Sequence, residues 1–530
     1  MRLAGGERRA AALLTVLVVA LRVWFARKVT FCGTPDSCYA LGVAQDLTRY
    51  HAFRVPFLFD LLLKHPQVPN TGIEYWRPGV SLLFAALKPF GGVTLHGALV
   101  IATLAGVLWA SAAWFVAERA TGNRRIALAS YALCLMLSPA WVGSLTPDPT
   151  LFYAAAIAWF LALFTVRRQG LVQDVLALAC VAAAYMIRND AGLLLIPLLA
   201  VLWLRWRAAK ERQSRGEGGP PGSSVGYALA ILVGFGLALA PMHMLYRHVL
   251  GTPFPAGAGQ ALYLNDLSDF SNYGMPVSMH TMLAHGMKHL VMMRVGATAL
   301  IVYRVLALVL GYPALVFLPT LWVRRREQPA EEALRLPELA GPIAFGVTVL
   351  AVYCLVLPAV GVFSALRSST ALLPVVSMIV VLAIVRAATT KRLAHVLTGT
   401  VIAIYLVSGV MDDRRSIDPM NQIGDVDRAQ ARALETMGAT SDPRTTVVMT
   451  PDPVQFSVTT GLPAIPVPGN GLDAITNEAL DLHASHAILD GEHLPGSLAE
   501  VTERLHPVET RTVPGQTVIL FELPRESKQQ

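Results

Sequence analysis

The sequence predicts a polytopic α-helical membrane protein that carries a small C-terminal α/β domain. Hydrophobic residues make up 54% of the 530 residues and charged residues only 15%, whereas a typical soluble domain has about 25% charged residues. The apolar residues gather in long blocks that can each cross a hydrocarbon core of roughly 30 Å, and the chain becomes far more polar after residue 411. This pattern excludes an ordinary soluble enzyme and a disordered chain.

About eleven apolar blocks are predicted to span the membrane as helices. They cover residues 10–27, 93–117, 126–142, 150–166, 172–187, 191–207, 225–248, 297–322, 340–361, 369–388 and 394–411. The first block is interpreted as a retained signal anchor, because no clear small-residue cleavage site follows Leu21. A further block at residues 78–92 is short and contains Lys88 and Pro89, so we expect it to lie as a helix in the outer interface.

Basic clusters between the blocks predict the orientation of the chain. They are Arg8/Arg9, Arg119/Arg124/Arg125, Arg167/Arg168, residues 205–215, residues 324–326 and Lys391/Arg392. All of them fall on one side on this count, and the positive-inside rule makes that side cytoplasmic. We therefore expect a plasma (inner) membrane protein with a cytoplasmic N-terminus. The net charge of +8 reflects these clusters, so it is a topology signal and does not indicate nucleic-acid binding.

The opposite side then receives five polar segments and the C-terminal tail. The segments are residues 28–92, 143–149, 188–190, 249–296 and 362–368. We divide the chain into a transmembrane domain at 1–411 and a soluble extracytoplasmic domain at 412–530. The tail shows strand patterns at 446–449, 464–468, 486–489 and 517–523, with a helix pattern at 472–483. This alternation predicts a layered α/β fold. On the cytoplasmic side, the Gly-, Pro- and Ser-rich residues 216–224 are interpreted as a flexible linker.

Five cysteines are present. Cys134, Cys180 and Cys354 lie inside apolar blocks and are expected to be small buried side chains. Cys32 and Cys38 share the first outer loop, where an oxidising compartment permits a disulfide. The sequence leaves both the paired and the unpaired state open.

Three aspartates are expected at one depth on the outer side. Asp36 lies in the first outer loop, Asp148 precedes the fourth span, and Asp190 precedes the sixth. A carboxylate at a low-dielectric boundary is costly unless it is paired or used. Helix capping alone is the alternative for Asp148 and Asp190. Asp36 precedes a helical pattern at residues 39–47 that we expect on the membrane surface. Capping of that helix is the alternative for Asp36, and a functional role is favoured.

Four short motifs follow one another on the outer side. They are Asp36-Ser37-Cys38-Tyr39-Ala40, Tyr75-Trp76-Arg77-Pro78-Gly79, Leu145-Thr146-Pro147-Asp148-Pro149 and Arg188-Asn189-Asp190. In this order and spacing they resemble the GT-C superfamily, the integral-membrane glycosyltransferases that use polyprenyl-phosphate sugars. The pattern is most similar to the branch of the protein O-mannosyltransferases and the bacterial lipid A aminoarabinose and galacturonic acid transferases. The resemblance covers residues 10–410. Many members have a second acid where this chain has Ser37.

The resemblance implies transfer of a sugar from a lipid phosphate to an acceptor hydroxyl. Asp36 is the expected general base, with Asp148 as the second candidate catalytic acid. Candidates for stabilising the phosphate of the donor are Arg367, Arg188, Arg77 and Arg294. Candidates for binding the substrate are Tyr39, Tyr75, Trp76 and Asp190. The alternatives are snorkelling for the arginines and an interfacial aromatic belt for the aromatic residues.

Cofactor, acceptor and competing functions remain open at this point. No cofactor is assigned; His280, His285 and His289 share one outer loop without a neighbouring acid, and a divalent metal is left possible. The acceptor can be a lipid, a glycan or a protein. The alternative function is a transporter or flippase of lipid-linked glycans, which would use charged residues inside spans, such as Arg22 and Arg304. A membrane scaffold would leave the three aspartates unexplained.

Overall fold

The structure is a computed structural model. It describes residues 6–61, 67–166, 170–215, 225–255, 260, 263–264, 269, 271–274, 277–323, 336–436, 446–490, 498–513 and 516–523. The basic clusters at 167–168 and 324–326 and the predicted linker at 216–224 lie outside these residues. The chain forms two compact units. We call them the helical unit (Met1–Ala26, Leu99–Leu245 and Arg294–Arg414) and the mixed unit (Arg27–Ala98, Tyr246–Met293 and Arg415–Gln530).

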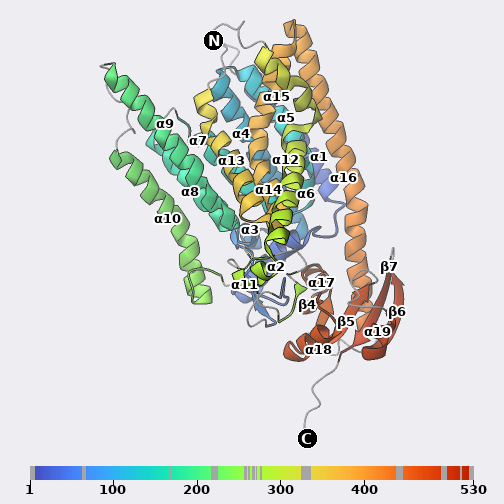
Figure 1. Ribbon diagram of the computed structural model, residues 1–530. Helices are drawn as coiled ribbons and strands as arrows, with labels where there is room; N and C mark the ends of the chain where they lie inside the picture. The colour runs from blue at the N-terminus through green and yellow to red at the C-terminus, as the bar shows by residue number, and fades with distance from the viewer. Residues whose placement is uncertain are drawn as a thin grey trace. The chain divides into compact units, whose positions relative to one another are not determined.

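Helices build the helical unit (Figure 1), and four of them have an end that belongs to the mixed unit. In chain order they are α1 (Gly6–Ala26), α4 (Leu95–Thr121), α5 (Arg124–Met136), α6 (Ser138–Leu145), α7 (Pro149–Leu163), α8 (Leu171–Ile187), η3 (Asn189–Leu194), α9 (Leu195–Ser214), α10 (Val225–Leu250), α12 (Met287–Val323), η7 (Leu336–Leu339), α13 (Ala340–Leu355), α14 (Pro358–Ser369), η8 (Thr370–Leu372), α15 (Leu373–Ala387) and α16 (Lys391–Thr436). Within this unit, α7 packs against α8, α5 against α15, and α9 against α13.

These helices make the chain a multi-pass membrane protein, as predicted. Among the described residues, seven helices are long and apolar enough to cross a membrane, or eight if the bent pair α5–α6 is one span. For example, the 27 residues of α4 extend over about 40 Å at the usual rise per residue, which exceeds the apolar core of a bilayer. Every predicted span overlaps one helix or a run of consecutive helices, while the total of eleven stays a prediction.

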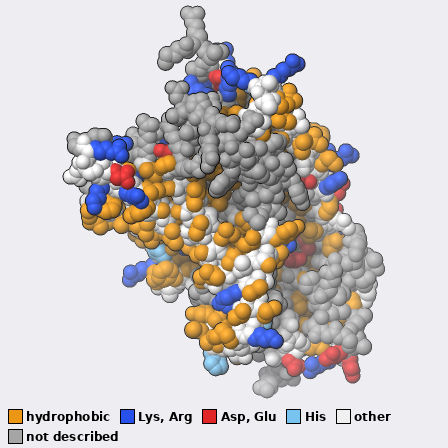
Figure 2. Space-filling model, turned by 45° about the horizontal axis from the view of Figure 1, so that its top comes forward, with side chains coloured by type: hydrophobic (Ala, Val, Ile, Leu, Met, Phe, Trp, Pro, Cys, Tyr) orange, Lys and Arg blue, Asp and Glu red, His pale blue; other side chains and the backbone are white. Residues whose placement is uncertain are grey.

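The surface of α8–α10 has the composition of a lipid-facing wall. Figure 2 shows hydrophobic side chains along the lobe that contains these helices, with Lys and Arg gathered at one end. The exposed residues include Leu199, Trp203, Leu229, Val233 and Leu237. A large exposed apolar surface is unfavourable in water, and it is ordinary where a bilayer is the solvent.

Several boundaries differ from the prediction; α12, for example, begins at Met287 and not at 297. Two further differences have a clear physical reason. The predicted span at 340–361 ends at Leu355, and α14 starts at Pro358, because proline lacks the N–H that would continue the helix and fits its first turn. The predicted outer segment at 362–368 is therefore helical. The last predicted span ends at 411, but α16 continues to Thr436. Its polar half keeps a buried stripe, which includes Asp413, Ile417, Asp427, Gln430 and Leu434, so helical periodicity continues after hydropathy falls.

A bend separates α5 from α6. The two helices meet at 46°, where Pro139 occupies the first turn of α6 and interrupts the hydrogen-bond ladder. Arg22 of α1 is fully buried at this bend. It donates a hydrogen bond to the Leu135 carbonyl at the end of α5 and lies 4.8 Å from the centre of the Trp141 ring in α6. Arg22 therefore holds the two helices at their break.

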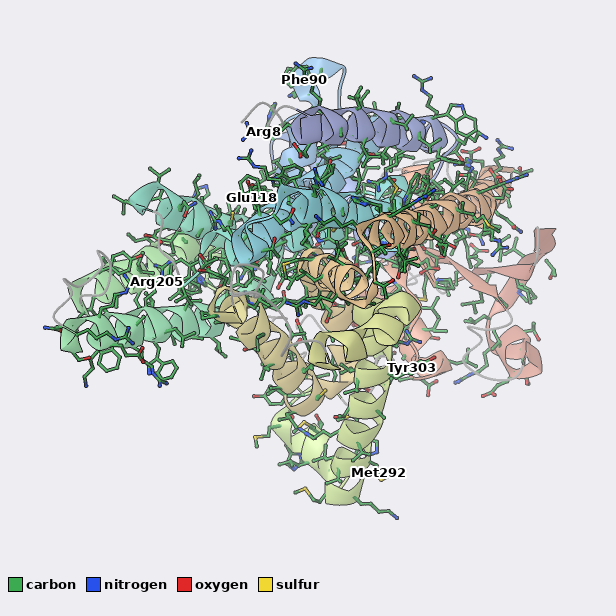
Figure 3. The ribbon with its side chains drawn as sticks, turned by 90° about the horizontal axis from the view of Figure 1, so that it is seen from above. Arg8, Phe90, Glu118, Arg205, Met292 and Tyr303 are labelled. Atoms are coloured by element: carbon green, nitrogen blue, oxygen red, sulfur yellow. A yellow bond between two sulfur atoms is a disulfide. The ribbon has the colours of Figure 1, made fainter. Side chains whose placement is uncertain are left out.

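A second buried arginine ties together α8, α9 and α10. Arg205, marked in Figure 3, donates to Asp174 at 3.3 Å, to the Tyr227 hydroxyl at 2.7 Å and to the Thr165 carbonyl at 2.6 and 2.9 Å. Tyr227 in turn donates to Asp174 at 2.7 Å, and Arg205 lies 4.4 Å from the centre of the Phe164 ring. We call Arg205, Asp174, Tyr227 and Thr165 the Arg205 cluster. It closes the end of the α8–α9 hairpin that is opposite the η3 turn.

The mixed unit contains the first loop and a β-sheet. The first loop forms α2 (Pro35–Tyr50), the antiparallel pair β1 (Arg54–Val55) and β2 (Asn70–Thr71), α3 (Gly79–Ala85) and η2 (Lys88–Phe90), and α11 (Met279–Ala284) follows later in the chain. The predicted surface helix at 39–47 lies inside α2, and the predicted interfacial block at 78–92 holds α3 and η2. Leu83 and Phe90 are exposed on that block, and Figure 3 shows Phe90 projecting from it.

The sheet has five strands in the order β4-β3-β5-β7-β6. They are β3 (Val447–Thr450), β4 (Ala464–Pro466), β5 (Ala484–Asp490), β6 (His506–Val513) and β7 (Gln516–Glu522). β3 pairs in parallel with β4 and β5, while β7 is antiparallel to β5 and β6. Three helices accompany the strands: α17 (Pro453–Thr460), α18 (Leu472–Asp481) and α19 (Leu498–Arg504). The four predicted strands and the predicted helix are confirmed, while α17, α19 and β6 were not predicted.

Successive side chains of the strands supply two cores. Met449, Leu489 and Phe521 pack with α18 in one core, whereas Val448 and Leu520 pack with α17 and the end of α16 in the other. This alternation is the two-residue period of a strand. The last turns of α16 are therefore one of the layers that cover the sheet, which explains why α16 continues beyond the apolar part of the chain.

Candidate active site

Asp36 lies in the first turn of α2, in the mixed unit. Thr34 is the N-cap and accepts a hydrogen bond from the Ser37 amide at 3.2 Å, and Pro35 occupies the first turn. Asp36 is buried, with 8% of its surface exposed. The N-terminal end of a helix stabilises a negative charge. Ser37, the residue that follows Asp36, makes a 2.8 Å contact with the Thr34 hydroxyl and so belongs to the cap.

A disulfide joins Cys32 to Cys38 and closes this turn. Both cysteines are buried. Gly33 inside the ring has φ +92°, a backbone conformation that favours glycine. The sequence left the pairing open, and the structure places Asp36 within a covalently closed turn.

An aromatic cluster lies close to α2 in the same unit. It consists of Tyr39, Phe57, Phe59, Tyr75 and Trp76. Phe59 stacks on Tyr75 at 4.4 Å between ring centres, and Tyr75 meets Trp76 edge to face at 4.8 Å. Tyr39 contacts Phe57 at 5.4 Å and Phe59 at 6.3 Å. The structure thus brings the three predicted aromatic residues together. It adds Phe57 and Phe59, which lie in a stretch without a recognisable motif.

Several ionisable groups of the mixed unit have shifted pKa values. Burial raises the pKa of the Tyr39 hydroxyl, and nearby Asp60 adds to the shift. Burial also raises the pKa of Glu74, and it raises the pKa of Asp46 to about 6 against the opposing effect of Arg49 and Arg54. Arg77 is buried and lies 5.6 Å from the centre of the Tyr246 ring. Arg77 is therefore held inside the mixed unit and does not extend along its surface as a snorkelling side chain would.

Asp148 caps a helix in the helical unit. It is the N-cap of α7, and its carboxylate accepts a hydrogen bond from the Thr150 amide at 2.7 Å. This confirms the capping geometry that the sequence left as an alternative. A capping hydrogen bond does not exclude a role in the reaction, so Asp148 remains a candidate catalytic residue.

Arg188 and Asp190 form the centre of a buried polar network in the helical unit. Arg188 Nε lies 3.0 Å from Asp190 Oδ1, and Arg188 Nη2 lies 3.2 Å from Oδ2. Arg188 also donates to Ser364 at 3.1 Å. Asp190 accepts hydrogen bonds from the Tyr353 hydroxyl and, at 3.1 Å, from the Ser368 hydroxyl. We call Arg188, Asp190, Tyr353, Ser364 and Ser368 the Arg188–Asp190 network.

This network connects the turn between α8 and η3 to α13 and α14. Its two charged side chains are each about nine-tenths buried, at 10% and 12% exposure. A paired and hydrogen-bonded ion pair is the form in which charges are stable at low dielectric. Arg188 also lies 5.4 Å from the centre of the Tyr153 ring. Tyr353 was not predicted, although a single tyrosine hydroxyl in an apolar block is a signal that a polar partner exists.

The two remaining predicted arginines occupy helix ends. Arg367 lies in the last turn of α14, next to Ser368 of the network. Arg294 of α12 donates to the Leu355 carbonyl, the last residue of α13, at 3.1 Å. A cation at a helix C-terminus is favourable for the helix dipole.

The predicted residues thus separate into two groups. Asp36, Tyr39, Tyr75, Trp76 and Arg77 belong to the mixed unit. The helical unit holds Asp148, Arg188, Asp190, Arg294 and Arg367.

The predicted histidine cluster is partly formed. The rings of His285 and His289 lie 5.3 Å apart. Within the described part of the chain, no group of three or more His, Cys, Asp or Glu side chains is arranged to hold a metal ion.

Part of the chain matches a known protein family. Residues 77–217 match the family model described as dolichyl-phosphate-mannose-protein mannosyltransferase. This stretch begins at Arg77 and includes Asp148, Arg188 and Asp190. No curated protein matches the chain in a sequence search.

Solved structures show the fold. ArnT from Cupriavidus metallidurans bound to undecaprenyl phosphate superposes with a TM-score of 0.55 at 11% identity, over 96% of this chain and 97% of that chain. The apo state of the same ArnT gives a TM-score of 0.41 at 14% identity, over 97% and 98% of the two chains. The apo oligosaccharyltransferase of Archaeoglobus fulgidus gives 0.45 at 11% identity, over 90% and 69%.

Residues 77–217 therefore resemble a membrane mannosyltransferase family, and the whole chain shares the fold of ArnT. The fold that the four motifs implied is therefore confirmed as a GT-C-like polytopic helical fold.

Proposed function

We propose that this protein transfers a sugar from a polyprenyl-phosphate donor to an acceptor hydroxyl at the outer face of the membrane. The matched family is a glycosyltransferase family, and the ArnT structure with the same fold contains undecaprenyl phosphate. The donor class proposed for this chain follows from these two findings. A lipid, a glycan or a protein can supply the acceptor hydroxyl.

The setting of Asp36 is the observation that carries the proposal. Its carboxylate belongs to a capped helix start that a disulfide closes, and a buried aromatic residue, Tyr39, follows one turn later on α2. A carboxylate that is fixed in this way suits proton transfer, since a general base must be held at hydrogen-bond distance from the hydroxyl it deprotonates. The aromatic cluster that includes Tyr39 of the same helix also contains Tyr75 and Trp76, and its rings offer flat apolar surfaces for a sugar ring.

In the proposed reaction, the acceptor oxygen forms a bond to the anomeric carbon of the donor sugar. The bond between that carbon and the phosphate oxygen breaks, and the electron pair leaves with the polyprenyl phosphate. Asp36 takes the proton of the acceptor hydroxyl. A single displacement of this kind inverts the configuration at the anomeric carbon.

The leaving phosphate gains negative charge, which cations stabilise. Arg77 and Arg367 are the first candidates for this role. Arg188 is paired with Asp190, so it would stabilise the phosphate less. Arg294 already donates a hydrogen bond to the Leu355 carbonyl. Asp190 would then act mainly by fixing Arg188 and the start of η3, and Asp148 is the second candidate acid.

A panel of radiolabelled polyprenyl-phosphate sugars tests the proposal in membranes that contain the wild-type chain or Asp36→Asn. We expect transfer from at least one donor by the wild type and a loss of about 100-fold or more in the variant, in line with the usual contribution of general base catalysis. The amount of folded protein is measured alongside by detergent gel filtration. Failure of every donor with folded wild type would contradict the proposal and favour the transporter alternative.

A further inference from the structure

The C-terminal part of the chain contacts the Asp36 turn and both of its flanking segments inside the mixed unit. Before the turn, Asn421 of α16 accepts from the Thr30 amide at 2.8 Å and donates to the Lys28 carbonyl at 2.9 Å. After α2, the Leu58 amide donates to the Ala464 carbonyl at 3.0 Å, and the Ala464 amide donates to the Pro56 carbonyl at 2.9 Å. Residues 56–58 thereby extend the edge of the sheet beside β4.

Gln455 of α17 reaches the turn itself. Its Nε2 donates to the Gly33 carbonyl at 3.0 Å, and this hydrogen bond is buried. Gly33 lies inside the ring closed by Cys32 and Cys38, three residues before Asp36. Gln455 is only 5% exposed, so its amide takes the place of water as the partner of that carbonyl.

The helix α17 also packs closely on α2. A Cβ atom added at Gly42 would lie 2.8 Å from Val458 Cγ2 and 3.2 Å from Phe57 Cε1. Only glycine at position 42 permits the two helices to approach to this distance. Along the chain, Asp36 lies between Gly33, which accepts the hydrogen bond from Gln455, and Gly42, which packs against Val458.

We infer that α17 is a positioning element for Asp36, with Gln455 and Val458 as its positioning residues. This inference rests on the proposed role of Asp36 as the base. The C-terminal domain is thereby a structural part of the catalytic apparatus, since it fixes the helix start that carries the carboxylate. The physical reason is the sensitivity of proton transfer to geometry: a displacement of about 1 Å can lower a rate by about 100-fold.

Gln455→Met tests the hydrogen bond. Methionine has a similar length but no donor, so the Gly33 carbonyl loses its partner. We expect kcat per folded molecule to fall by about tenfold or more, with the KM for donor and acceptor changed by less than about twofold. Gln430→Met is the matched control, because Gln430 is an equally buried glutamine, at 7% exposure, on α16. A role in folding alone would lower the yield and leave kcat per folded molecule unchanged, and that result would overturn the inference.

A rescue experiment tests the helix contact. Gly42→Ala places a methyl group against Val458 and is expected to lower kcat, while the double variant Gly42→Ala/Val458→Ala removes the opposing methyl groups and should regain most of the loss. A double variant as slow as Gly42→Ala, with Val458→Ala alone at the wild-type rate, would show that the α2–α17 contact does not position Asp36.

A second measurement does not depend on the reaction. The rate at which a water-soluble phosphine reduces the Cys32–Cys38 disulfide reports how firmly the turn is held, because both sulfur-bearing residues are buried in the wild type. We expect faster reduction in Gln455→Met and in Gly42→Ala than in wild type and Gln430→Met. Without any transfer by the wild type, the proposed function fails, yet faster reduction would still support the positioning of the turn. Equal reduction rates would refute it.

Discussion

At the scale of a single residue, Asp148 is both a helix cap and a candidate catalytic residue. Its carboxylate caps α7 through the Thr150 amide, and it is the second acid of the motif pattern. Asparagine caps helices about as well as aspartate, so the charge and the cap can be separated by mutation.

We expect Asp148→Asn to keep the unfolding temperature of the wild type and to lower the transfer rate by about tenfold or more if the charge takes part in the reaction. Asp148→Ala should lose the same activity and, in addition, about 1 kcal/mol of stability with the cap. Thermal unfolding and initial rates of the purified proteins measure the two effects. A full rate in Asp148→Asn would reduce Asp148 to a cap.

Glu478 makes the stability of the mixed unit depend on pH. It is fully buried on α18, and its carboxyl oxygens have no hydrogen-bond partner among the described residues. Burial, helped by the negative charge of Asp481, raises the pKa of Glu478 well above its ordinary value. The folded state therefore retains a proton that the unfolded state releases near pH 4.3 (roughly the model-peptide value).

The stability that comes from protonated Glu478 is complete below that pH and is lost as the pH rises through the pKa of the folded state. Glu478→Gln stays neutral at every pH. We expect it to be more stable than the wild type at pH 8, by about 1–3 kcal/mol, and to resemble it at pH 4.5. Unfolding curves at both values measure this difference. A constant offset between the two proteins across the pH range would contradict the explanation.

The residues of the site were predictable to different degrees. Asp148 and Asp190 were found because each precedes an apolar block, which is a local signal. The partners of Asp190 were not found, because Tyr353 and Ser368 are 163 and 178 residues away along the chain. A lone hydroxyl in an apolar block indicates that a partner exists, but it does not indicate which one.

At the scale of the element, the Arg205 cluster stabilises the α8–α9 hairpin and α10. Both side chains of its ion pair are buried: Arg205 is 5% exposed and Asp174 is 2% exposed. Removing one partner of a buried pair leaves the other charge uncompensated, which typically costs about 3–5 kcal/mol.

Asp174→Asn is therefore expected to lower stability by about that amount, whereas Tyr227→Phe should cost only about 1 kcal/mol, the usual value of one hydrogen bond. Glu211→Gln provides the control, since it breaks the exposed Arg207–Glu211 pair on the same helix and should change little. Thermal unfolding in detergent compares the variants. If Asp174→Asn and Glu211→Gln were equally stable, the cluster would not support the hairpin.

Periodicity and hydropathy predicted most elements, and the exceptions have physical reasons. The strands β3 and β7 are apolar and were predicted, whereas β6 (His506–Val513) contains an unbroken polar run at 509–512 and lies at the edge of the sheet. The helix α16 was cut at 411 because hydropathy falls there. Its polar half is ordered by a buried stripe against the sheet, and that stripe depends on tertiary contacts.

At the scale of the whole molecule, the sequence predicted two domains divided after residue 411. The compact units divide the chain close to that position, at Arg414, but they add residues 27–98 and 246–293 to the C-terminal part. The contacts of Gly33 with Gln455 and of Leu58 with Ala464 connect positions that are about 400 residues apart. No local pattern in the sequence reports such a pairing. The fold class, by contrast, depends on composition and was predictable.

We propose that the protein transfers a sugar with Asp36 as the general base. The most direct test is the initial rate of transfer by purified Asp36→Asn in lipid vesicles, beside Asp46→Asn, which makes the same change on the same helix. We predict a loss of about 100-fold or more for Asp36→Asn, with a rate close to wild type for Asp46→Asn and equal folded yields. Equal rates for wild type and a folded Asp36→Asn would contradict the assignment of the base.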